Sequence, residues 1–130
     1  MYSFSTQLKC SFEIAQQQVT EALKEQGFGV LTEIDVQATL KKKLGLEKRP
    51  YKILGACNPV LANQALEAEP DIGLLLPCNV VIRKEEDDSI TVAFMDPAAV
   101  LTLVDRDDVV ALADQVKEKL LHVKESLEND

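Results

Sequence analysis

The chain of 130 residues has no tryptophan and one histidine, and aromatic residues make up 5% of it. Its core must therefore consist mainly of Leu, Val, Ile and Ala side chains. No apolar run approaches the roughly 20 residues that a membrane-spanning helix needs. The first residues, MYSFS, lack the basic region and the apolar stretch of a signal peptide. The sequence thus predicts a cytoplasmic protein with no membrane partner.

The cysteines and the histidine form no recognised metal or catalytic pattern. The chain has an odd number of cysteines, and no two of them have the CxxC spacing; they are Cys10, Cys57 and Cys78. Neither a zinc ribbon nor a disulfide framework is therefore expected. His122 lies off the apolar stripe of the predicted last helix and is expected on the surface. We therefore predict no metal site and no Cys-His or Ser-His-Asp arrangement within one chain, and the sequence leaves any cofactor unknown.

Positive charge is scarce, because the chain contains 14 Lys and Arg residues and 22 Asp and Glu residues, which gives a net charge of −8. Nucleic-acid binding depends on clustered Lys and Arg, so we expect no nucleic-acid partner. One basic cluster lies between Lys41 and Lys52. A solvated surface is the favoured interpretation of this cluster, and an anion site is the alternative.

Hydrophobic periodicity predicts one α+β domain over residues 1–130. Alternating patterns indicate strands at residues 2–8, 30–34, 51–57 and 90–95, and helical spacing indicates helices at 11–26, 60–67, 98–103 and 107–126. A further short helix is expected between Asp35 and Gly45. The apolar run at residues 72–83 contains Pro77, which marks a sheet edge, a bulge or the true start of a strand.

Three stretches, GFGVLTEIDV at residues 27–36, PYKILGACNP at 50–59 and IGLLLPCNVV at 72–81, resemble a known family, and Asp96-Pro97 completes the set. The family is the bacterial and archaeal one catalogued as domain of unknown function 302, and the resemblance covers essentially the whole chain. It implies a fold similar to the TATA-binding-protein type. Such a fold has a curved, mainly antiparallel five-stranded sheet with helices packed on one face, including a long C-terminal helix. It also implies a homodimer, but no defined reaction; some members accompany sulfur-oxidation proteins, which points to thiol or persulfide chemistry.

Two Cys-Asn pairs, Cys57-Asn58 and Cys78-Asn79, are the candidate site. If the two segments converge, their thiols and amides line one pocket. Cys57 precedes the helix start Asn58-Pro59, where helix N–H groups lower a thiol pKa and favour the nucleophilic thiolate. The alternative is that Cys57 is a small core residue. Cys78 lies in an apolar run, where burial raises a thiol pKa.

Glu33 and Asp35 are further candidate ligand-binding residues, because they alternate onto the same strand face. A carboxylate pair performs acid–base chemistry when burial raises one pKa. The favoured alternative is one solvated strand residue and one helix N-cap.

Three functions remain open on the sequence, and it leaves undecided whether the protein is an enzyme. The first is a homodimeric module that binds a small ligand near the Cys-Asn pairs. The second is a thiol-dependent enzyme or sulfur carrier that uses Cys57 as its nucleophile. The third is a structural dimer that acts through a partner protein. A dimer is expected because Val81, Thr91, Ala93 and Met95 share a strand face and are too apolar for full exposure.

Overall fold

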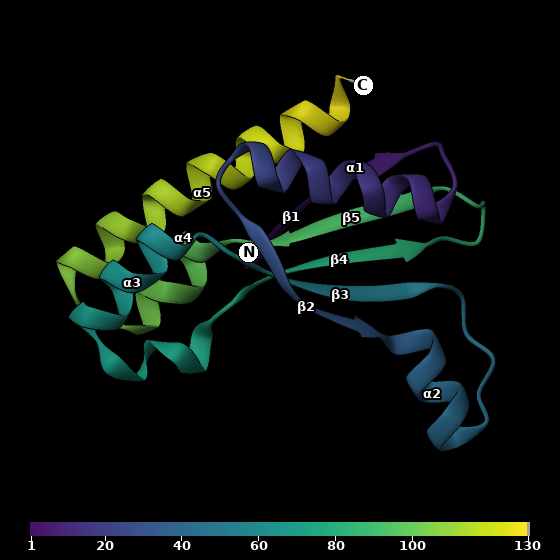
Figure 1. Ribbon diagram of the computed structural model, residues 1–130, viewed down its shortest axis with the longest axis horizontal. Helices are drawn as coiled ribbons and strands as arrows, with labels where there is room; N and C mark the ends of the chain where they lie inside the picture. Colours follow the sequence, from purple (N-terminus) through teal and green to yellow (C-terminus); the bar gives the residue numbers. More distant parts are fainter. Residues whose placement is uncertain (130) are drawn as a thin grey trace.

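The alternating segments form one five-stranded antiparallel sheet in the order β1-β5-β4-β3-β2 (Figure 1). The computed structural model describes residues 1–129. Each strand pairs with its neighbour through backbone hydrogen bonds, and the two sheet edges are β1 and β2. The strands are β1 (Ser3–Leu8), β2 (Gly29–Asp35), β3 (Tyr51–Cys57), β4 (Cys78–Lys84) and β5 (Ile90–Met95).

Two long helices, α1 (Phe12–Glu25) and α5 (Asp107–Glu128), lie on the same side of this sheet (Figure 1). Their apolar stripes and the inward side chains of the strands form the larger hydrophobic cluster. Leu23, Leu120 and Phe94 are among its fully buried members. The expected α+β fold, with helices packed on one face and a long C-terminal helix, is confirmed.

A second hydrophobic cluster lies beyond one end of the sheet. It is built by α3 (Pro59–Ala68), the 3-10 helix η1 (Pro70–Leu75), α4 (Pro97–Val100), the 3-10 helix η2 (Leu101–Leu103) and the first half of α5. Leu61, Ile72, Leu101 and Val109 are buried in it. Because α5 is long, its first half packs in this cluster and its second half packs on the sheet (Figure 1).

Helix α2 (Val36–Leu44) has a different environment from the other helices, because none of its residues is buried. The Asp35 side chain accepts a hydrogen bond from the N–H of Ala38 at its start, and Gly45 ends it with a φ of 67°. Glycine adopts this left-handed conformation without steric cost. In Figure 1, α2 projects from the end of the sheet opposite to α3, away from α1 and α5.

The apolar run at residues 72–83 resolves into two elements. Pro77 marks the true start of a strand, since β4 begins at Cys78, while Ile72 and Leu75 belong to η1. Pro has no N–H to donate to a sheet ladder, and a position just before the first paired residue avoids that loss. None of the helices within residues 1–129 is both long enough and apolar enough to cross a bilayer.

The sheet face opposite α1 and α5 is open. Ser5, Ala93, Val81 and Ile53 lie side by side across it, in register on four successive strands. They are half-buried or exposed, unlike Val80, Val92 and Phe94 on the covered face. We refer to this surface as the open face.

Candidate functional site

A cavity of about 260 Å³ lies between the two hydrophobic clusters, where β3 and β4 meet α3 and the middle of α5. Its walls combine members of both clusters with residues that belong to neither. The lining residues are Phe28, Leu31, Ala56, Cys57, Asn58, Leu61, Ala62, Ala65, Leu66, Gly73, Leu76, Pro77, Cys78, Leu101, Leu112 and Val116. Both cysteines of the two Cys-Asn pairs therefore face one space.

The start of α3 fixes one wall of this cavity. Asn58 ends β3 in an extended conformation, and its Oδ1 accepts a hydrogen bond from the N–H of Leu61 at 3.2 Å. Pro59 takes the first helical position, where its missing N–H costs nothing. The helix then presents Ala62 and Ala65, side chains too small to fill the space in front of them.

The opposite wall depends on close packing around Gly55. This glycine pairs with Thr32 on β2 and with Asn79 on β4. An added Cβ would meet the Thr32 hydroxyl, and it would approach Cγ of Pro77 to 2.7 Å. The absence of a side chain at Gly55 thus allows Pro77 to lie against the sheet and to form part of the cavity wall.

Both cavity thiols are expected to be protonated at neutral pH. Burial raises the pKa of the Cys78 thiol to about 11, and a negative charge on the neighbouring Cys57 raises it further in the same direction. Burial also raises the pKa of Cys57 above its ordinary value. The expectation from the sequence that the start of α3 lowers the pKa of Cys57 is therefore wrong in direction.

The physical reason is burial, and the first turn of α3 offers few free donors to offset it. Pro59 has no N–H, and the N–H of Leu61 donates to the Asn58 side chain. The N–H of Ala62 donates to the Asn58 carbonyl oxygen at 2.8 Å. A thiolate at Cys57 would therefore gain little stabilisation from this helix, while burial disfavours its charge.

A sequence model of the family described as domain of unknown function DUF302 matches residues 4–127. The chain belongs to this family. Its fold is similar to the crystal structure of an uncharacterized conserved DUF302 protein from Bacillus stearothermophilus, with a TM-score of 0.89 and 24% identity. That similarity covers 97% of this chain and 98% of the other. No curated protein matches the chain. The resemblance in the sequence is thus confirmed for family and fold.

The two asparagines of the DUF302 Cys-Asn pairs have different surroundings. Asn58 lines the cavity, but its carboxamide oxygen is engaged as the helix cap. Asn79 pairs with Gly55 and is exposed on the open face, whereas the next residue back, Cys78, points inward. The alternation of side chains along β4 separates them, so Asn79 does not line the cavity.

The two carboxylates proposed from the sequence lie elsewhere in the DUF302 domain. Glu33 forms an ion pair with Lys52 at 3.2 Å and accepts a hydrogen bond from Nε2 of Gln16 at 2.6 Å. Asp35 caps α2. Neither lines the cavity. Their surroundings match the alternative of a solvated strand residue beside an N-cap.

Sequence reasoning missed the part of the cavity wall that comes from distant segments. Phe28 and Leu31 flank it at the start of β2, and Leu101, Leu112 and Val116 close it from η2 and α5. In the sequence these residues have the spacing of ordinary core positions, so no local signal distinguishes them. Within residues 1–129, no three His, Cys, Asp or Glu side chains are grouped as a metal site would require.

Proposed function

We propose that this DUF302 domain binds a small, uncharged, apolar molecule in the cavity at the Cys-Asn pairs. One observation carries the proposal. Within residues 1–129, none of the residues that line the cavity has a charged side chain, and most are Leu, Ala, Phe, Val or Pro. Ligand pockets of this kind are concave, largely apolar and contain a few polar groups.

The polar groups of the cavity favour an uncharged ligand. The oxygen of Asn58 is occupied as a cap, and the two thiols are neutral at pH 7 because burial raises the pKa of each. An ion that entered this space would lose its hydration without gaining a partner charge, and such a transfer costs several kcal/mol. An apolar ligand, in contrast, gains about 25 cal/mol for each Å² of surface that it buries.

The proposal is tested with N-phenyl-1-naphthylamine, a neutral apolar dye that fluoresces when it leaves water. We expect saturable binding to the wild-type protein and at least a tenfold weaker affinity for Ala62→Leu, because roughly 1–2 kcal/mol of apolar contact is lost when leucine fills the space. Asn63→Leu is the matched control, because residue 63 is exposed on the same helix. Equal affinities for both variants would refute the proposed site.

Thiol chemistry at Cys57 is a second candidate, favoured by the placement of this cysteine. Cys57 is half-buried in the cavity wall, while Cys78 beside it is buried. A ligand in the cavity would lie against the Cys57 sulfur, as a thiol-dependent enzyme or sulfur carrier requires. The raised pKa weighs against this candidate, because the thiolate is the reactive form.

We propose further that the domain is a homodimer that buries its open face. Ile53, Val81 and Ala93 lie together at the centre of this face, and Met95 extends the apolar strip along β5. A two-fold pair would remove this surface from water in one step. Light scattering should give the mass of two chains for the wild type and of one chain for Val81→Lys. Gln115→Lys, on the exposed side of α5, is the control; a one-chain mass for the wild type would rule the dimer out.

A further inference from the structure

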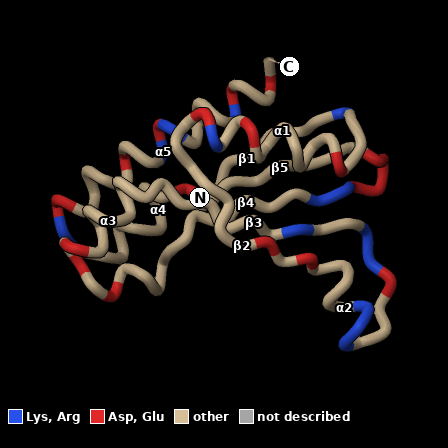
Figure 2. Tube along the Cα trace, in the orientation of Figure 1, with Lys and Arg blue, Asp and Glu red and all other residues tan. Residues whose placement is uncertain are grey.

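The two ends of the molecule differ in charge. Figure 2 shows Lys and Arg concentrated around α2 and the segment that follows it, and Asp and Glu at the far end, beyond α3. Further acidic residues lie on β2 and on the turn between β4 and β5. The basic end carries Lys41, Lys42, Lys43, Lys48 and Arg49, all exposed. The overall charge of −8 conceals this separation. The α2 segment therefore has the charge that the acidic end of a second copy would attract.

The basic end is a projecting, partly apolar element. We call residues 36–49 the α2 arm. Its lysines accompany Leu44 and Leu46, which are 66% and 43% exposed, while Val36 and Leu40 are half-buried. A leucine that packed on its own domain would be covered, as Leu23, Leu120 and Leu127 of α1 and α5 are. One acid, Glu47, lies in the arm and pairs with Lys41 at 3.6 Å, so the arm presents exposed apolar side chains beside a net positive charge.

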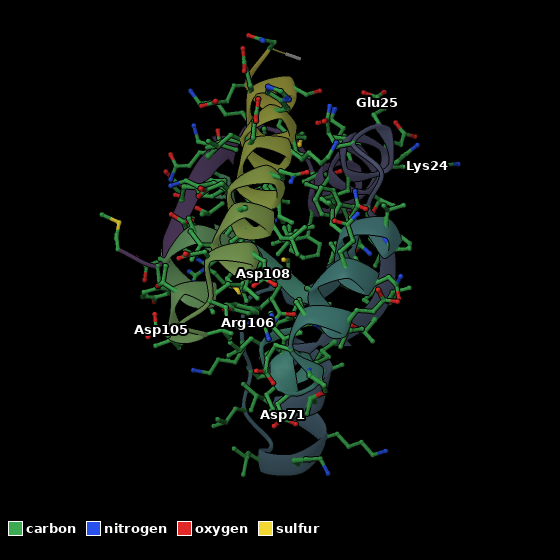
Figure 3. The ribbon with its side chains drawn as sticks, turned by 90° about the vertical axis from the view of Figure 1, so that its left-hand side faces the viewer. Lys24, Glu25, Asp71, Asp105, Arg106 and Asp108 are labelled. Carbon is green, nitrogen blue, oxygen red and sulfur yellow. The ribbon has the colours of Figure 1, made fainter. Side chains whose placement is uncertain are left out.

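At the opposite end, η1 and η2 enclose a groove that has the complementary composition. We call it the acidic groove. Leu74 and Leu103 are 86% and 77% exposed along it. The groove residues are Glu69, Asp71, Leu74, Leu75, Leu103, Val104, Asp105 and Arg106. Figure 3 shows Asp71 and Asp105 at this end of the molecule, on either side of Arg106.

The single cation of the groove does not offset its acidity. Nη2 of Arg106 lies 2.8 Å from Oδ2 of Asp108, its Nε lies 3.1 Å from Oδ1 of the same residue, and its Nη1 donates to the carbonyl oxygen of Ala68. Because Asp108 balances this guanidinium, the charges of Glu69, Asp71 and Asp105 remain. A basic segment with exposed leucines matches both features of the groove.

We propose that the α2 arm of a second copy docks into the acidic groove, and that the exchange is reciprocal. This inference rests on the proposed homodimer. The arm and the groove lie at opposite ends of the long axis, and the arm projects on the side away from α1 and α5 (Figures 1 and 3). A two-fold axis that lies between two open faces, perpendicular to the long axis, exchanges the two ends. Each arm then reaches the groove of its partner, and the assembly closes as a dimer.

Paired charge reversals test this contact. The arm variant carries Lys42→Glu and Lys43→Glu, and the groove variant carries Asp71→Lys and Asp105→Lys. All four residues are exposed, so both variants should keep the wild-type circular dichroism spectrum. In each variant alone, like charges meet at both contacts of the dimer. We expect self-association to weaken about tenfold in each, measured by sedimentation velocity at low salt.

An equimolar mixture of the two variants provides the decisive measurement. In a mixed dimer, the reversed arm meets the reversed groove and the native arm meets the native groove, so both contacts are attractive again. We therefore expect the mixture to dimerise with an affinity within about threefold of the wild type, and salt to weaken that association.

Matched controls keep the net charge equal while leaving the contact intact. Lys9→Glu with Lys24→Glu matches the arm variant, and Asp114→Lys with Glu118→Lys matches the groove variant. Both controls should dimerise as the wild type does. A wild-type dimer that neither reversal weakens would overturn the docking of the α2 arm but leave the homodimer in place. Two weakened variants whose mixture stays weak would overturn the docking too, and a monomeric wild type would overturn both proposals.

Discussion

The substitution Gly55→Ala is the sharpest test of the packing that holds the cavity wall. A methyl group at this position has no free space, because it would meet the Thr32 hydroxyl and would come within 2.7 Å of Cγ of Pro77. Thr32 can rotate about its Cα–Cβ bond, but the proline ring has no such freedom. The new methyl group would therefore displace the segment that precedes β4, together with the cavity residues Leu76 and Pro77.

The expected loss of stability follows from two opposing terms. Overpacking a well-packed site costs about 1–3 kcal/mol, while replacing glycine by alanine returns roughly 0.5–1 kcal/mol through the unfolded chain. The net destabilisation is about 1–2 kcal/mol. With an unfolding entropy of about 2.1 cal/mol/K per residue, the melting temperature should fall by about 4–7 °C.

Thermal and urea unfolding followed by circular dichroism measures this effect, and Gly29→Ala supplies the control. Gly29 lies on the neighbouring strand, pairs with Cys57, and has no atom within 4 Å of an added Cβ. Adding Thr32→Ala to Gly55→Ala should recover part of the loss, since the Thr32 oxygen is removed while its Cβ would lie at an acceptable 3.5 Å. If Gly55→Ala proved as stable as Gly29→Ala, the close packing would be refuted.

Three further predictions address the thiols, an unpaired hydroxyl and the helix cap. Between pH 9 and 11, the free energy of unfolding should fall by about 2 kcal/mol more in the wild type than in Cys78→Ala. The reason is that the fold raises the pKa of the Cys78 thiol from 9.0 to about 11, so its contribution to stability is present below pH 9 and is lost as the folded thiol ionises. Equal pH profiles would contradict this. Thr91 is 3% exposed, and its Oγ1 has no hydrogen-bond partner within residues 1–129. Thr91→Val should therefore raise the free energy of unfolding by about 1 kcal/mol. The control Thr102→Val removes a 2.7 Å hydrogen bond to the Ala99 carbonyl oxygen and should give no such increase. Asn58→Ala removes the cap of α3 and should lower the free energy of unfolding, measured in urea, by about 1 kcal/mol. Asn58→Asp keeps a capping oxygen and should retain most of the wild-type stability. An unchanged urea midpoint for Asn58→Ala would count against the cap.

The sequence was a good guide to the elements because periodicity reflects burial directly. The stripe of Val109, Leu112, Leu120 and Val123 predicted α5, and each of these residues is buried. An apolar run carries less information where it lacks a period. Ile72 and Leu75 could continue a strand or turn into a short helix, and tertiary packing of Ile72 in the second cluster selects the 3-10 helix η1.

The cavity itself is not a local property of the chain. Its walls come from β2, β3, α3, η1, β4, η2 and α5. The space exists because small residues, Ala62 and Ala65, face larger ones across it. A sequence pattern shows which residues are apolar, but it does not show that two hydrophobic clusters fail to close against each other. The Cys-Asn pairs located the cavity because both lie where a strand meets another element, at the end of β3 and the start of β4.

The direction of the Cys57 pKa was mispredicted because the same residues serve two purposes. In the sequence, Asn58-Pro59 predicts a helix start that stabilises a thiolate. A good cap, however, uses part of the donors that would do so, since Asn58 accepts from the N–H of Leu61 and Pro59 contributes none. Burial then decides the direction of the Cys57 pKa. Helix N-termini stabilise neighbouring anions only through N–H groups that remain unpaired. A strong capping pair beside a cysteine therefore argues for a neutral, buried thiol, which is also what an apolar cavity accommodates.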